Sequence, residues 1–105
     1  MAPQPVANRA GAYLQGAFLE GAHLEEAFLE GAQLQKAYLE GAQLQKAHLE
    51  GAHLEEAYLE GAQLQSAYLR GAHFEDAKVT PSTSWPENFD WKAAKVRYIT
   101  EIDLY

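Results

Sequence analysis

Histidines and carboxylates are the residues of this chain best suited to chemistry, and several of them share a fixed spacing. His53 and His73 lie twenty residues apart, and each is followed two positions later by a glutamate, Glu55 or Glu75. Two imidazoles and one carboxylate are ligands that Zn²⁺ accepts. The alternative is a row of hydrated, unligated side chains on a flat surface. Because such a surface supplies neither convergent ligands nor supporting hydrogen bonds around them, we predict no metal site.

A second regular set consists of the carboxylates of Glu20, Glu40 and Glu60. If residues twenty apart stack, these carboxylates lie about 5 Å apart, close to the separation in retaining glycosidases. A flat face without a cleft, however, neither binds a substrate nor separates the pKa values of neighbouring carboxylates. His23 and His48 have no histidine twenty residues away, and the sequence contains no phosphate-binding loop, nucleophile elbow or HExxH motif. We therefore predict a non-enzymatic protein without catalytic or cofactor-binding residues.

These spacings are multiples of a five-residue repeat that fills most of the 105-residue chain. Alanine recurs at every fifth position from Ala12 to Ala77, and a large apolar residue follows two positions after each alanine. We predict that these apolar residues form the core: Leu14, Leu19, Leu24, Leu29, Leu34, Leu39, Leu44, Leu49, Leu54, Leu59, Leu64, Leu69 and Phe74.

The five-residue period excludes the two simplest secondary structures. In an α-helix, a five-residue step rotates the leucine by about 140°, so that the leucines spread around the helix instead of forming a stripe. In a flat strand, an odd period sends successive leucines to opposite faces. A coil that turns a corner every five residues, by contrast, returns each alanine and each leucine to the inside.

The Ala-x-Leu-x-x units from Ala12 to Pro81 resemble the pentapeptide-repeat family, whose motif centres on Leu or Phe with Ala two positions earlier. The resemblance implies an all-β protein, a right-handed quadrilateral parallel β-helix with four repeats in each coil. Some members of the family resemble duplex DNA and protect or inhibit type II topoisomerases. The family favours Asp or Asn directly before the central Leu, whereas this chain has Tyr, Phe, His, Gln or Lys there. We therefore expect the family fold with an unusual outer surface.

A four-repeat coil places residues twenty apart in vertical contact, at the inter-strand spacing of about 4.8 Å. Two aromatic ladders on opposite faces then form a candidate interaction surface: Phe18, Tyr38 and Tyr58 on one, and Phe28, His48 and Tyr68 on the other. Opposite charges are expected to pair in the same way: Glu26 with Lys46, and Lys36 with Glu56.

Glycine and charged residues alternate at the corners of the coil. Gly21, Gly41 and Gly61 share one corner, and glycine also occupies a second corner. Type II turns need a positive φ at their third position, which glycine adopts without strain. We predict type II turns at the glycine corners and another turn geometry at the other two.

Both ends of such a coil need covers, because each exposes unpaired backbone groups. We assign residues 1–11 to an N-terminal lead-in, 12–81 to the β-helix and 82–105 to a C-terminal cap. The segment from Thr83 to Asp90 resembles the exit segment of the family, and the predicted cap residues are Trp85, Phe89 and Trp91. Residues 90–105 fit either a short helix N-capped by Asp90 or an edge strand. This aromatic tail could pack against its own coil or against a second copy of the chain, so the sequence leaves both a monomer and a homodimer as alternatives.

Composition limits the partners. The net charge of −7 argues against direct nucleic-acid binding, and no apolar run in the sequence approaches the roughly 18 residues of a membrane span. The chain has no cysteine, which excludes disulfides and fits a cytoplasmic protein. An interior of Leu and Ala alone is expected to leave no room for a ligand or cofactor.

These observations favour a non-catalytic scaffold that presents flat aromatic and acidic faces to a protein partner or to a second copy. The alternative is a DNA mimic that binds a type II topoisomerase (gyrase). Fourteen repeats rise only about 17 Å, however, or about half a turn of B-DNA, and Lys36 and Lys46 interrupt the acidic surface. Such regular repetition is also what a designed sequence would contain, although the irregular tail argues against that origin.

Overall fold

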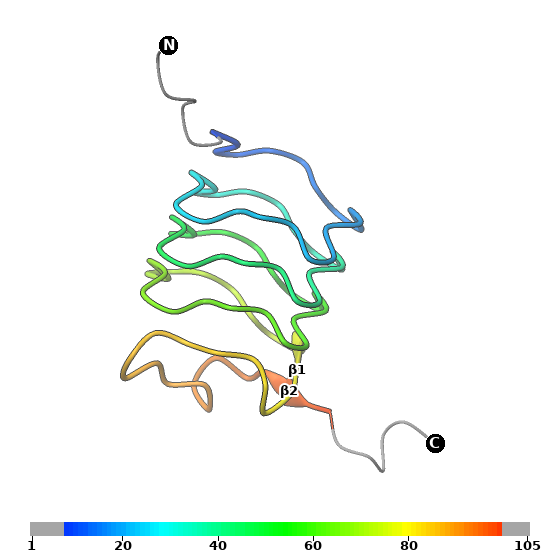
Figure 1. The fold of residues 1–105 in the computed structure, drawn as a ribbon, viewed down its shortest axis with the longest axis vertical. Coiled ribbons are helices and arrows are strands. Elements are labelled where there is room, and N and C mark those ends of the chain that lie inside the picture. Colours follow the sequence, from blue (N-terminus) through cyan, green and yellow to red (C-terminus); the bar gives the residue numbers. More distant parts are fainter. Residues whose placement is uncertain (1–7, 100–105) are drawn as a thin grey trace.

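The computed structural model describes residues 8–99, which form a solenoid of stacked coils (Figure 1). Single parallel bridges join residues twenty apart, from Tyr13 with Gln33 to Tyr58 with Lys78. The chain turns a corner after every five residues, so each coil has four sides. The β-helix expected from the repeat is therefore confirmed. Residues 8–99 contain no helix long and apolar enough to cross a membrane.

Corners of both kinds close in the same way. The alanine N–H donates to the carbonyl of the leucine three residues earlier, for example from Ala47 to Leu44 at 3.0 Å. The residue before the alanine has a positive φ whether it is glycine (66° at Gly41) or not (60° at Lys46). The prediction of a different turn at the non-glycine corners is therefore wrong. Hydrogen bonds between coils fix the corner, and a non-glycine residue there adopts the left-handed conformation at a cost of about 1–2 kcal/mol.

Alanine and leucine side chains fill the interior of the solenoid. The leucines from Leu34 to Leu64 are at most 1% exposed. The inward leucines of the first coil, Leu14, Leu19 and Leu24, are only partly buried, because within residues 8–99 no coil lies above them; Leu69 is also only partly buried.

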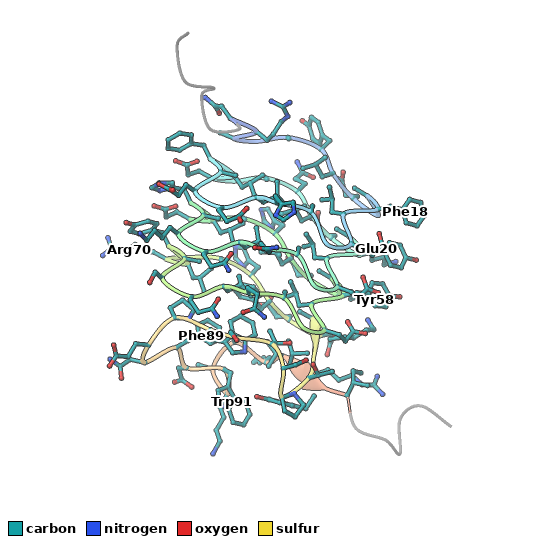
Figure 2. All side chains as sticks on the ribbon, in the orientation of Figure 1. Phe18, Glu20, Tyr58, Arg70, Phe89 and Trp91 are labelled. Atoms are coloured by element: carbon teal, nitrogen blue, oxygen red, sulfur yellow. The ribbon has the colours of Figure 1, made fainter. Side chains whose placement is uncertain are left out.

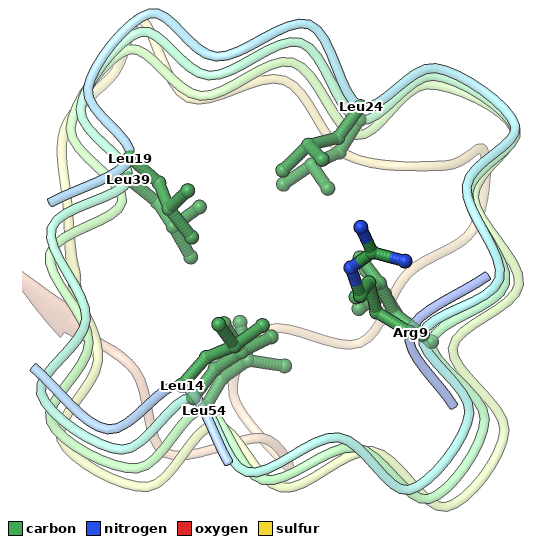
Figure 3. Close-up of a pocket in the computed structure, with 10 residues that line it drawn as sticks. Arg9, Leu14, Leu19, Leu24, Leu39 and Leu54 are labelled. Carbon is green, nitrogen blue, oxygen red and sulfur yellow. The ribbon is translucent and has the colours of Figure 1, made fainter. Parts of the chain in front are cut away.

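The first coil also leaves space inside it. Arg9 occupies the position of a leucine there, and together with the leucines of the upper coils it lines a cavity of about 200 Å³. Figure 3 shows Arg9, Leu14, Leu19 and Leu24 directed toward the central axis. The expectation of an interior without room is therefore wrong at the N-terminal end.

The C-terminal segment closes the opposite end with aromatic rings. Phe74 is 2% exposed and contacts Trp85 and Phe89 edge-on, at centroid distances of 5.4 and 5.7 Å. The rings of Trp85 and Phe89 stack on each other at 4.2 Å. Trp91, predicted to be part of the cap, lies outside this plug: it is 41% exposed, and its ring contacts Tyr98.

The backbone of this segment completes the edge of the last coil. Strand β1 (Lys78–Val79) pairs in parallel with β2 (Arg97–Tyr98). Between them, the Asp90 side chain accepts a hydrogen bond from the N–H of Ala93 at 3.1 Å, as a helix N-cap does. Residues 91–95 form only a turn, which ends at Lys95 with a φ of 60°. Of the two alternatives for this segment, the helix is wrong and the strand is present at 97–98; residues 100–105 lie outside the described part.

Candidate functional site

Four columns of outward side chains cover the walls of the solenoid, each joined by the parallel bridges. We name each wall after one member: the Tyr13 wall (Tyr13, Gln33, His53, His73), the Phe18 wall (Phe18, Tyr38, Tyr58, Lys78), the His23 wall (His23, Gln43, Gln63, Ser84) and the Phe28 wall (Asn8, Phe28, His48, Tyr68).

The Phe18 wall carries a continuous stack of rings. Centroid distances are 5.0 Å from Phe18 to Tyr38 and 4.7 Å from Tyr38 to Tyr58, and the ring planes differ by 15° and 1°. The ammonium group of Lys78 lies 4.7 Å from the centroid of Tyr58 and so ends the stack with a cation–π contact. Phe18 and Tyr58 project from the same side of the solenoid (Figure 2). The stacking predicted from the twenty-residue spacing is confirmed.

The Phe28 wall, on the opposite side, carries the second stack. His48 lies between two rings, with centroid distances of 4.9 Å to Phe28 and 4.6 Å to Tyr68. Tyr68, the last ring of this column, is 51% exposed, and Phe18, the first ring of the other, is 77% exposed. The rings of both columns therefore form flat, partly apolar strips with exposed ends.

Two groups of histidine and glutamate side chains converge on the walls. One consists of Glu30, His48 and Glu50, and the other of Glu55, His73 and Glu75; within each group the ligand atoms lie within 4.8 Å of one another. Both have the same construction, a His-x-Glu sequence together with a glutamate eighteen residues before the histidine.

Sequence reasoning identified only part of these groups. It singled out His53 and His73 because they stack, and their rings do lie 4.7 Å apart. His48 was set aside because no histidine lies twenty residues from it, and Glu30 and Glu50 in the neighbouring column were not considered with it. The eighteen-residue spacing is the signal that would have found this group. Because the side chains are partly or fully exposed, an ion bound there would keep much of its water, and weak cation binding is the most that three such ligands can give.

The Glu20, Glu40 and Glu60 column runs along a corner next to the Phe18 wall, where Glu20 projects outward (Figure 2). Partial burial raises the pKa of Glu40, the charges of Glu60 and Glu20 raise it further, and a hydrogen bond from its own backbone N–H opposes the increase. The raised pKa of Glu40 thus comes first from its partial burial and then from the neighbouring carboxylates. It does not create the two distinct environments that acid–base catalysis by a carboxylate pair requires.

Charge pairs between the coils are partly as predicted. The ammonium nitrogen of Lys36 lies 3.8 Å from a carboxylate oxygen of Glu56, and both side chains are exposed. Glu26 and Lys46 form no ion pair in the described part of the chain, contrary to the prediction. Both pairs lie at solvent-facing corners, where long side chains keep several rotamers and gain little from pairing.

Comparison with known proteins shows to which family the chain is similar. The family model described as "Pentapeptide repeats" matches residues 10–41 and 37–76, with eight copies. No curated protein is matched. Among solved structures, the chain is similar to alr5209, a pentapeptide repeat protein from Nostoc PCC 7120, with 31% identity, a TM-score of 0.52, and coverage of 88% of this chain and 84% of that one.

A second similar structure is AT2G44920, a pentapeptide repeat protein from the thylakoid lumen of Arabidopsis thaliana. Its identity is 30% and its TM-score 0.59, and the match covers 78% of this chain and 60% of that one. These matches, the twenty-residue bridges and the four-sided coils agree. The chain belongs to the pentapeptide-repeat family.

Proposed function

We propose that this structural repeat scaffold binds a protein partner through the aromatic strip of the Phe18 wall. The observation that carries the proposal is the unbroken stack of Phe18, Tyr38 and Tyr58, with Phe18 77% exposed at its end. Exposed aromatic rings are enriched at protein interfaces, because they bury a large area while few rotatable bonds become fixed.

Rigidity adds to the suitability of this wall for binding. Each ring is held by the ring above or below it, and the backbone at Tyr38 is hydrogen-bonded to both neighbouring coils, so little entropy is lost when a partner docks there. The His23 wall has the same backbone but carries mainly polar side chains, His23, Gln43 and Gln63. It therefore provides a matched control within the same molecule.

The test compares two double variants by crosslinking in the native cell followed by mass spectrometry. Tyr38→Ala with Tyr58→Ala removes two rings of the strip, and Gln43→Ala with Gln63→Ala removes two amides of the control wall. We expect a partner that is recovered with the wild type and the control but lost with the aromatic variant, while circular dichroism shows that all three keep the fold. Recovery of the same proteins from both variants would refute the role of the strip.

The acidic column of Glu20, Glu40 and Glu60 favours a second candidate, a DNA mimic that binds gyrase. Carboxylates repeated along the axis are what such a mimic needs, and the charges of Glu60 and Glu20 add to the effect of burial in raising the pKa of Glu40. The cations of Lys36 and Lys46 at the neighbouring corners weaken this candidate. A supercoiling assay decides: inhibition of gyrase that disappears with Glu40→Gln and Glu60→Gln supports the mimic, and the absence of inhibition by the wild type excludes it.

A further inference from the structure

The N-terminal edge of the solenoid carries backbone groups that lack partners within residues 8–99. In an inner coil, the wall residue points both of its backbone groups toward the N-terminal side: the N–H of Gln33 donates to Ala12 at 2.8 Å, and its carbonyl accepts from Leu14 at 2.7 Å. The same groups of Tyr13, Phe18 and His23 point the same way and have no such bonds in the described part of the chain.

The two ends of the solenoid therefore differ. At the C-terminal end, the carbonyl of Ser84 accepts a hydrogen bond from Leu64 at 2.7 Å, that of Lys95 accepts one from Asp76 at 3.0 Å, and β2 pairs with β1. At the N-terminal end, Tyr13 and Phe18 are 78% and 77% exposed, and the cavity of about 200 Å³ lies inside the coils, lined by Arg9 and the inward leucines. An unpaired sheet edge beside exposed apolar side chains is a surface suited to pairing with another chain.

We propose that this end binds the same end of a second copy of the chain, through antiparallel edge contacts on all four walls. The cross-section of about 25 by 24 Å gives roughly 600 Å² for each copy, or about 1,200 Å² in total, which reaches the size of a specific interface. This contact goes beyond the partner binding proposed above and does not depend on it, because it is made by backbone groups at the end of the solenoid, whereas that binding is made by the rings of the Phe18 wall.

The pitch of the coil selects one register for this contact. Over four walls the chain advances by one inter-strand spacing of about 4.8 Å, so the end is a ramp with one step, where Asn8 lies over Phe28. Consider two copies related by a two-fold axis perpendicular to the solenoid axis. The gap between their opposed edges is the same on all four walls only if the step of one copy lies against the step of the other. In that register, Tyr13 lies opposite Phe18 of the second copy, and Asn8 lies opposite His23 of the second copy.

Side-chain sizes and charges agree with this register. Directly opposed residues of an antiparallel pair exchange two hydrogen bonds, which satisfies both backbone groups of Tyr13 and of Phe18. Inside the contact, Leu14 meets Ala17 of the second copy, so a large side chain faces a small one. Arg9 meets Ala22, and Glu20 meets Gly11, so no two like charges face each other.

A cysteine-pairing experiment tests the register, because the chain contains no cysteine of its own. Tyr13→Cys and Phe18→Cys are made as separate single variants, which are oxidised alone and then as an equimolar mixture. Opposed residues of a hydrogen-bonded antiparallel pair have Cα atoms about 5.5 Å apart, within the reach of a disulfide. We expect a linked dimer containing one of each variant in the mixture, and none from either variant alone. Equal linking in all three samples, or none in the mixture, would overturn the register.

Sedimentation of the full chain over a wide concentration range tests the contact itself. We expect the wild type to form a reversible dimer. The double variant Tyr13→Lys with Phe18→Lys should be monomeric, because lysines of the two copies would face each other across the contact. The control, Tyr68→Lys, changes an exposed ring far from this end and should stay dimeric. If the wild type is a monomer and dimerises only after removal of residues 1–7, those residues occupy the end in the full chain, and the proposal is overturned. A dimer that resists the lysines but needs residues 100–105 would place the contact at the tail. Either result leaves the partner-binding proposal for the Phe18 wall standing.

Discussion

Replacing Lys46 by glycine is expected to stabilise the solenoid, because Lys46 holds a left-handed backbone conformation, with a φ of 60°. That conformation costs a non-glycine residue about 1–2 kcal/mol. Glycine removes this cost but gains about 0.4–1 kcal/mol of backbone freedom in the unfolded chain. The free energy of unfolding should therefore rise by up to about 1.6 kcal/mol with Lys46→Gly. Within residues 8–99 the Lys46 side chain forms no ion pair, so the substitution loses no charge contact there.

The reverse change at a glycine corner should have the opposite sign. A Cβ added at Gly41 meets no atom within 4 Å, so Gly41→Lys carries only the backbone cost and should lower the free energy of unfolding by a similar amount. Thermal unfolding followed by circular dichroism measures both, since 1 kcal/mol corresponds to about 4–8 °C in a domain of this size. Lys46→Ala is the control: it removes the long side chain but keeps the strained φ, and should change the midpoint little. A lower midpoint for Lys46→Gly would refute the argument that these corners are strained.

Three further outcomes are expected. Phe74→Ala should lower the free energy of unfolding by about 3–5 kcal/mol in chemical denaturation, because it empties the plug, whereas Trp91→Ala, at an exposed ring, should cost far less. The pKa of Glu40 is raised in the folded state, so its contribution to stability is fully present below the ordinary value of 4.5 and is lost as the pH rises through the raised value. Glu40→Gln should therefore flatten the dependence of the free energy of unfolding on pH in that range. An unchanged pH dependence would contradict the pKa shift. A double-mutant cycle on Lys36 and Glu56 should give a coupling below about 1 kcal/mol that vanishes at high salt, and a larger coupling would show that the pair is better ordered than its exposure suggests.

The vertical organisation of the molecule could be predicted from sequence because it depends on one number, the length of a coil. Once twenty residues make a turn, the stacking of Phe18 on Tyr38 and of His53 on His73 follows without knowledge of any dihedral angle. Features that depend on lateral neighbours were missed. His48 joins Glu30 and Glu50 across columns, and that contact depends on the positions of outward side chains along a wall as well as on the pitch.

Corner geometry was mispredicted for a different reason. Single-residue preferences assign the left-handed region to glycine, so a charged residue such as Glu26 or Lys36 suggests another turn. In the solenoid, the corner is held by the bond from alanine to leucine and by bonds to the neighbouring coil, for example from the N–H of Lys36 to Glu55 at 3.1 Å. The bond from alanine recurs at the corners from Ala12 to Ala77, most corners add a bond to the neighbouring coil, and together these bonds outweigh a local cost of about 1–2 kcal/mol.

The ends of the solenoid show what a repeat leaves undetermined. A periodic sequence defines each coil by its neighbours, so the same residue type is buried at Leu54 and only partly buried at Leu14, where the neighbour above is missing from the described chain. Closure must come from residues outside the period. At the C-terminal end it does: the bridge from Gln63 reaches Ser84, one residue more than the repeat allows, and the chain then places Trp85 over Phe74. At the N-terminal end, Arg9 replaces a leucine and no ring covers the cavity among residues 8–99. Within residues 8–99 the two ends thus carry different chemistry although the coils between them are nearly identical, which is why we place the proposed contact with a second copy at the N-terminal end.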